Sequence, residues 1–171
     1  LLETKDRHLL NHGSRVSFYA TLTAHRLSLS IADQQSLALG ALVHDLDLIS
    51  ASNTHVLDMD SNPQTHSPDL GARMGRAMGL SADVVQVIAL HHERWDGTGY
   101  PFGLQEDRTP LLARIVAIAQ VFDDLTADKP EGIPLSFDEA IQQIEQQAGT
   151  AFDPALTEVF CLTMREQPPQ R

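Results

Sequence analysis

Residues 81–101, SADVVQVIALHHERWDGTGYP, combine an amphipathic helix with an unusual loop. Ser81 is a good N-cap because its hydroxyl can accept a hydrogen bond from the first helical turn, and apolar residues follow it at helical spacing. His91 and His92 end this helix, and the glycines and proline of the next few residues restrict the backbone of the loop. Since adjacent imidazoles suit a metal site, the stretch predicts a helix that delivers two histidines to a shaped loop.

Helical periodicity dominates the rest of the chain as well. Pro68 and Pro110 stand where helices are expected to begin, Ser136 is a second N-cap, and Gly79 and Gly149 stand where helices end. No strand, internal repeat or low-complexity segment is indicated. The pattern predicts an all-α domain of about seven helices over residues 1–171, with a frayed tail at 166–171. The expected helices cover residues 16–27, 32–46, 68–78, 82–92, 110–125 and 137–147, with a last helix from 153 onward.

Composition excludes several classes of function. The chain has 171 residues, of which 42% are hydrophobic, and a formal net charge of −11. This charge, without a cluster of lysine or arginine, disfavours binding to nucleic acid. No apolar run reaches the roughly 20 residues of a membrane span. Cys161 is the only cysteine, so no internal disulfide forms, and a cytoplasmic location is expected.

The positions of three of the eight histidines suggest a metal site. A lone histidine is more often a surface or core residue than a ligand. Here, however, the pairs His44-Asp45 and His91-His92 each end an apolar helix at the start of a long loop. Imidazole and carboxylate together suit iron, manganese, nickel or zinc. Two such pairs would suit a centre of two metals that supports phosphodiester hydrolysis by a bridging hydroxide.

These motifs together resemble the HD-GYP domain, the bacterial branch of the HD phosphohydrolases that hydrolyses cyclic di-GMP. The resemblance implies an HD-domain helical bundle with a Gly-Tyr-Pro loop and a centre of two or three metals. By position it implies the ligands His12, His44, Asp45, His91 and His92. The matching segments are HGSRV at 12–16, HD at 44–45, the signature at 91–104, ARI at 113–115, FDDLT at 122–126 and FDP at 152–154.

The chain departs from the family pattern where phosphate is handled. Leu48 stands where the family has a lysine that contacts the scissile phosphate, and Asp47 adds a negative charge that opposes an anionic substrate. Lys129 stands where the family has an arginine, so a forked phosphate contact becomes at most a point charge. Lys129 is kept as a recognition residue, and no catalytic residue is assigned.

Other departures concern the metal ligands. Ser67 stands where the family has its middle histidine, and His66, one residue out of register, is kept as a candidate ligand. Gln120 replaces a ligand aspartate, and an amide oxygen is a weaker, uncharged ligand. His8 stands where some members have a glutamate, and an exposed helix residue is the favoured interpretation. The expected metal content is therefore one or two transition metals, with a metal-free domain as the alternative.

Two functions remain open, and the first is favoured. In the first, phosphodiesterase activity is weakened or lost, and the domain is a signalling module whose loop residues Gly97, Gly99, Tyr100 and Pro101 recognise cyclic di-GMP or a GGDEF-type protein. In the second, the domain is an active metal-dependent cyclic di-GMP phosphodiesterase. Another HD-type nucleotide hydrolase is disfavoured by the Gly-Tyr-Pro loop. The resemblance also implies an output domain of a larger regulator and leaves a homodimer open.

Overall fold

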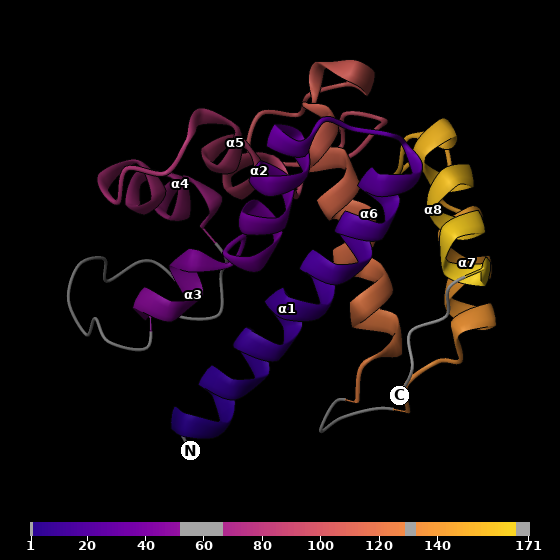
Figure 1. The fold of residues 1–171 in the computed structure, drawn as a ribbon, viewed down its shortest axis with the longest axis horizontal. Helices are drawn as coiled ribbons and strands as arrows, with labels where there is room; N and C mark the ends of the chain where they lie inside the picture. Colours follow the sequence, from indigo (N-terminus) through magenta and orange to yellow (C-terminus); the bar gives the residue numbers. More distant parts are fainter. Residues whose placement is uncertain (1, 52–66, 129–132, 167–171) are drawn as a thin grey trace.

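The computed structural model describes residues 2–51, 67–128 and 133–166 and confirms the all-α prediction (Figure 1). Within these ranges there are two isolated β-bridges, at Asp96–Gln105 and Ala148–Phe152, and no strand. No helix in these ranges is both long enough and apolar enough to cross a membrane. The helices are α1 (Leu2–Arg26), α2 (Ile31–Leu42), α3 (Leu46–Ala51), α4 (Pro68–Ala77), α5 (Ala82–Leu90), the 3-10 helix η1 (Glu106–Arg108), α6 (Leu111–Thr126), α7 (Phe137–Glu145) and α8 (Pro154–Glu166).

All seven expected helices are present, with two differences in extent. α1 begins at Leu2, well before the apolar face that predicts it, because its first half is rich in leucine and charged residues of high helix propensity. The helix expected at 32–46 ends at Leu42, and the short helix α3 begins at Leu46. The His44 ring causes part of this break, since its Nδ1 lies 2.7 Å from the Ala41 carbonyl oxygen and takes that backbone acceptor. His44 and Asp45 therefore lie in the turn between two helices.

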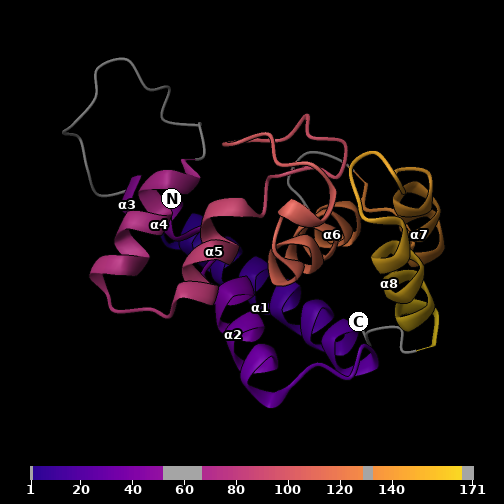
Figure 2. The same ribbon diagram turned by 90° about the horizontal axis from the view of Figure 1, so that it is seen from above.

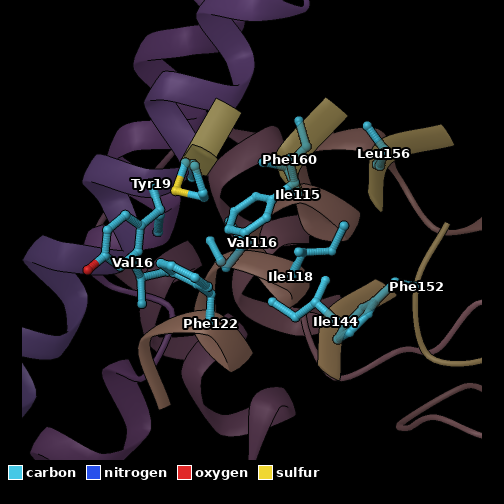
Figure 3. Packing of buried hydrophobic residues seen from close by; sticks show 14 of the residues in the cluster. Val16, Tyr19, Ile115, Val116, Ile118, Phe122, Ile144, Phe152, Leu156 and Phe160 are labelled. Carbon is cyan, nitrogen blue, oxygen red and sulfur yellow. The ribbon is translucent and has the colours of Figure 1, made fainter. Parts of the chain in front are cut away.

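The hydrophobic core lies between α1, α6, α7 and α8 (Figure 3). Phe122 of α6 is fully buried, and its ring lies edge-on to Tyr19 of α1 at 5.1 Å and to Phe160 of α8 at 5.5 Å between centroids. Burial of an aromatic side chain contributes about 1.5–3 kcal/mol, so this contact fixes α6 against α1. The residue after it, Asp123, is consequently held at a defined place beside α1.

The helices α3, α4 and α5 lie on the opposite side of α6 from α7 and α8 (Figure 2). Two glycines allow close packing on this side. A Cβ added at Gly40 would lie 2.9 Å from the Val87 side chain, and one added at Gly71 would lie 2.9 Å from Ile88. Because α2 and α4 both press closely on α5, the C-terminal end of α5 is brought next to the turn between α2 and α3.

Candidate metal centre and its loop

Three histidines from three parts of the chain surround Asp45. The nearest atom is Nε2 of His44, 3.2 Å from an Asp45 carboxylate oxygen. The Nε2 atoms of His12 and His91 follow at 3.8 and 3.9 Å. One ligand atom from each of His12, His44 and Asp45 lies within 4.8 Å of the others. The structure therefore brings together, around one carboxylate, ligands predicted from α1, from the α2–α3 turn and from the end of α5.

The backbone orients two of these rings. His44 Nδ1 lies 2.7 Å from the Ala41 carbonyl, and His91 Nδ1 lies 3.0 Å from the Ile88 carbonyl. A carbonyl only accepts, so in both rings Nδ1 carries a hydrogen, and Nε2 is the ring nitrogen that faces Asp45. Both side chains are buried. This arrangement of the rings and the carboxylate fits a divalent metal, because neutral imidazoles with a fixed tautomer are the form that coordinates.

His12 is oriented by a side chain instead. Its Nδ1 lies 2.7 Å from an oxygen of Asp123, whose carboxylate also accepts two hydrogen bonds from Arg15. Burial opposes a charge on His12, but the hydrogen bond to Asp123 and the negative charges of Asp123 and Asp45 outweigh it and raise the pKa of His12. Burial likewise opposes the charge on Asp123, and the hydrogen bonds from His12 and Arg15 outweigh it and lower the pKa of Asp123.

His92 connects this cluster to the Gly-Tyr-Pro loop. Its ring lies 4.0 Å from that of His91 and is stacked on Tyr100 at 4.7 Å, with 19° between the planes. Tyr100 is half exposed, and burial of its phenol together with the charges of Asp47 and Asp45 raises its pKa. The loop therefore folds back so that an exposed aromatic ring stands at the edge of the histidine cluster.

A buried carboxylate holds the loop in this position. Glu93 is 5% exposed, and its two oxygens accept the backbone N–H of Phe102 at 2.7 Å and of Leu104 at 3.0 Å. Gly99 lies against the backbone, where an added Cβ would stand 2.4 Å from the Arg94 nitrogen. The Tyr100–Pro101 peptide bond is cis. The loop shape thus depends on the missing side chain at Gly99 and on the carboxylate of Glu93.

The start of the same loop is attached to the other side of the molecule. The backbone N–H of Trp95 and of Asp96 donate to carbonyls of Ala151 and Thr150, at 3.1 and 2.9 Å. The guanidinium of Arg114 stands 5.6 Å from the centre of the Trp95 ring. The loop is therefore fixed between the histidine cluster and the connection of α7 to α8.

The structure places three of the positions at which departures from the family pattern are expected. Asp47 is buried and accepts the backbone N–H of Ser67 at 2.6 Å, so it ties α3 to the start of α4. Leu48 is half-buried in α3. Gln120 lies one turn before Asp123 on α6, and its buried Oε1 has no hydrogen-bond partner among the residues the structure describes. The amide oxygen of Gln120 is thus placed where a weak ligand would have no competing protein donor.

Some predicted site residues cannot be compared with the structure. His66 and Lys129 lie outside the described residues, and the same holds for the His8 side chain. Sequence reasoning missed the roles of Arg15 and Glu93, and it considered Asp47 only as an added charge. The His-x-x-Arg spacing of residues 12–15 places both side chains on one helix face and is the signal that points to Arg15.

The helical bundle and its histidine–aspartate cluster define a helical domain of the metal-binding type. The chain belongs to the HD domain family, whose model matches residues 1–156. It is 30% identical over 162 residues to 3'3'-cGAMP-specific phosphodiesterase 3 of Vibrio cholerae, covering 90% of this chain and 35% of that protein. It is 35% identical over 150 residues to the cyclic di-GMP phosphodiesterase response regulator RpfG of Xanthomonas campestris, covering 82% of this chain and 39% of that protein.

Solved structures agree with this assignment. A cyclic GMP-AMP-specific phosphodiesterase of Vibrio cholerae superposes with a TM-score of 0.72 at 26% identity, covering 92% of this chain and 44% of the other. An HDGYP protein of Bdellovibrio bacteriovorus shares the fold, with a TM-score of 0.69 at 22% identity over 92% of this chain and 52% of the other. These matches confirm the resemblance to HD-GYP domains. The chain spans 35% and 39% of the length of the two curated relatives described.

Proposed function

We propose that this domain binds a cyclic dinucleotide at a metal centre held by His12, His44, Asp45, His91 and His92, and that its phosphodiesterase activity is weakened or lost. The observation that carries the proposal is the convergence of three histidine Nε2 atoms on Asp45 beside the stacked pair of His92 and Tyr100. The names of the relatives, phosphodiesterases of cyclic di-GMP and of 3'3'-cGAMP, support a cyclic dinucleotide as the ligand.

The chemistry that a bound divalent metal supplies is positive charge for the phosphodiester and a more acidic water. Iron, manganese, nickel and zinc all suit these ligands. In their neutral form His44 and His91 would offer Nε2, because the backbone carbonyls hold the ring hydrogen at Nδ1, and Asp45 offers the central carboxylate. Tyr100 and Phe102 are 47% and 71% exposed and offer aromatic faces to a base or to a partner protein.

We infer weak hydrolysis from the charged groups that are missing at positions 48 and 120. Leu48 has no donor or charge for a phosphate oxygen, and Gln120 brings no negative charge to a metal. Loss of a single stabilising donor costs on the order of 10²- to 10³-fold in other enzymes. The altered positions therefore favour binding over turnover, and the loop residues 97–101 then serve recognition of the dinucleotide or of a GGDEF-type protein.

The test is to restore both groups. The double variant Leu48→Lys/Gln120→Asp, loaded with Fe²⁺ or Mn²⁺, should hydrolyse cyclic di-GMP or 3'3'-cGAMP at least about 100-fold faster than the unchanged protein, measured by chromatography of the products. The matched control is Leu39→Lys/Gln143→Asp, which makes the same changes at exposed positions of α2 and α7. Calorimetry should detect binding of one of the two dinucleotides to the unchanged protein.

The intact cluster around Asp45 favours a second candidate, an active phosphodiesterase. Rapid turnover by the unchanged, metal-loaded protein would establish it and overturn the proposal of weak hydrolysis. Binding of neither dinucleotide, with metal present, would overturn both.

A further inference from the structure

The ion pair of Arg15 and Asp123 lies directly behind the candidate metal centre. Asp123 of α6 is 1% exposed. The Arg15 side chain of α1 donates to both of its oxygens, from Nε at 2.5 Å and from Nη2 at 2.9 Å. The oxygen that accepts from Nη2 also lies 2.7 Å from Nδ1 of His12. One buried carboxylate thus contacts an arginine on one side and a candidate metal ligand on the other.

This geometry restricts the His12 ring. A carboxylate held by a forked guanidinium cannot rotate freely, because rotation would break two charge-assisted hydrogen bonds. Its oxygen therefore fixes the position of the His12 Nδ1–H, and Nε2 remains directed at Asp45, 3.8 Å away. In His44 and His91 the same task is done by carbonyls of their own helices. The His12 ring is held instead by a side chain from another helix, Asp123 of α6.

We infer that Arg15 and Asp123 are positioning residues for His12: Asp123 fixes its ring, and Arg15 fixes Asp123. The part that concerns metal affinity rests on the proposed function, whereas the part that concerns the ring does not. In metal sites, carboxylates that orient a ligand histidine change metal affinity by about 10- to 100-fold when they are replaced. Replacement of Asp123 should therefore weaken metal binding although Asp123 is not itself a ligand.

A second ion pair in the chain provides a matched control. Asp153 is buried, like Asp123, and is paired with Arg114. It accepts the backbone N–H of Ala155 at 2.9 Å at the start of α8, so it has a structural role. Its side chain lies near the α7–α8 connection rather than beside His12. A purely structural effect of breaking a buried Asp–Arg pair should appear equally in both places.

The experiment compares Asp123→Asn with Asp153→Asn in the full chain. The first readout is the downfield proton signal of the His12 Nδ1–H in NMR spectra without added metal. It should be present in the unchanged protein and in Asp153→Asn, and shifted upfield or lost in Asp123→Asn. The second readout is the affinity for Mn²⁺ and Zn²⁺ by competition with a chelator. It should fall about 10- to 100-fold in Asp123→Asn and change less than about twofold in Asp153→Asn.

Arg15→Lys tests whether Arg15 positions Asp123, and it replaces Asp123→Asn in the comparison if that variant does not fold. A lysine cannot reproduce the forked contact, so the His12 signal should broaden and metal affinity should fall by less than in Asp123→Asn. An unchanged His12 signal in Asp123→Asn, or equal losses in the two aspartate variants, would overturn the inference. If the unchanged protein binds neither metal, the proposed function fails, and the NMR comparison alone decides the positioning role.

Discussion

The candidate site has two sides that differ in how they are built. On one side, His12, His44, Asp45 and His91 match the family, and their rings are fixed by buried partners. On the other side are Leu48, Ser67 and Gln120, where departures from the family pattern are expected. Leu48 lies in the short helix α3, Ser67 directly before α4 and Gln120 within α6. The difference teaches that hydrogen bonds to the ring nitrogens themselves set the geometry of the first side, so we expect that side to be the more sensitive to a single substitution.

The largest expected effect is a loss of metal affinity when Asp45, at the centre of the histidine cluster, is replaced. Asp45→Asn keeps the shape but removes the charge to which three imidazoles point. In other metal sites, replacing a residue that only orients a ligand already lowers metal affinity by about 10- to 100-fold. Replacing Asp45 itself should therefore lower the affinity for Mn²⁺ by about 100-fold or more, measured by chelator competition. Asp33→Asn, at the start of α2 and away from the cluster, is the control. Equal affinities for the two variants would mean that the cluster around Asp45 is not the metal site.

The loop beside the histidine cluster should be intolerant of a single methyl group. In Gly99→Ala, the new Cβ would lie 2.4–2.6 Å from backbone atoms of residues 92–94, which have little room to move. We expect a loss of about 2–3 kcal/mol in the free energy of unfolding by urea, as for overpacked sites. Gly79→Ala is the comparison, because its Cβ meets open space and its φ of +77° costs only about 1 kcal/mol. A smaller loss at Gly99 than at Gly79 would contradict the close contact.

The side with the expected departures should be destabilised when the residue expected from the family pattern is introduced. Asp47→Gly introduces the glycine that the resemblance to HD-GYP domains implies at this position. The change removes the acceptor of the Ser67 N–H and adds a glycine to α3. We expect it to lower the free energy of unfolding by about 1–3 kcal/mol. Asp69→Gly makes the same change at an exposed position in the first turn of α4 and should cost about 1 kcal/mol or less. An unchanged free energy of unfolding in Asp47→Gly would contradict a stabilising role for the hydrogen bond between Asp47 and Ser67.

These comparisons also show what the sequence could predict. The helices, their serine caps and the candidate ligands His44 and His91 follow from periodicity and motif, because these are local properties of the chain. The contacts of Glu93 with residues 102 and 104, and of Asp123 with Arg15, depend on how distant segments meet. The break before His44 was missed for a related reason, since a side chain there takes a backbone acceptor that periodicity alone assigns to the helix.

The smallest expected effect concerns the core on the far side of the molecule. Cys161 of α8 is buried, and this burial raises the pKa of its thiol to about 11. At pH 8 only about one thiol in a thousand is therefore ionised, and alkylation by iodoacetamide should be slow in the folded protein and fast in urea. Asp45→Asn should leave the native rate of alkylation within about twofold, because Asp45 is not among the residues of the core cluster that contains Cys161. Gly99→Ala should raise it somewhat more, because the loop donates backbone hydrogen bonds to Thr150 and Ala151 just before α8. A tenfold increase in Asp45→Asn would instead mean that the candidate metal centre and the core open together.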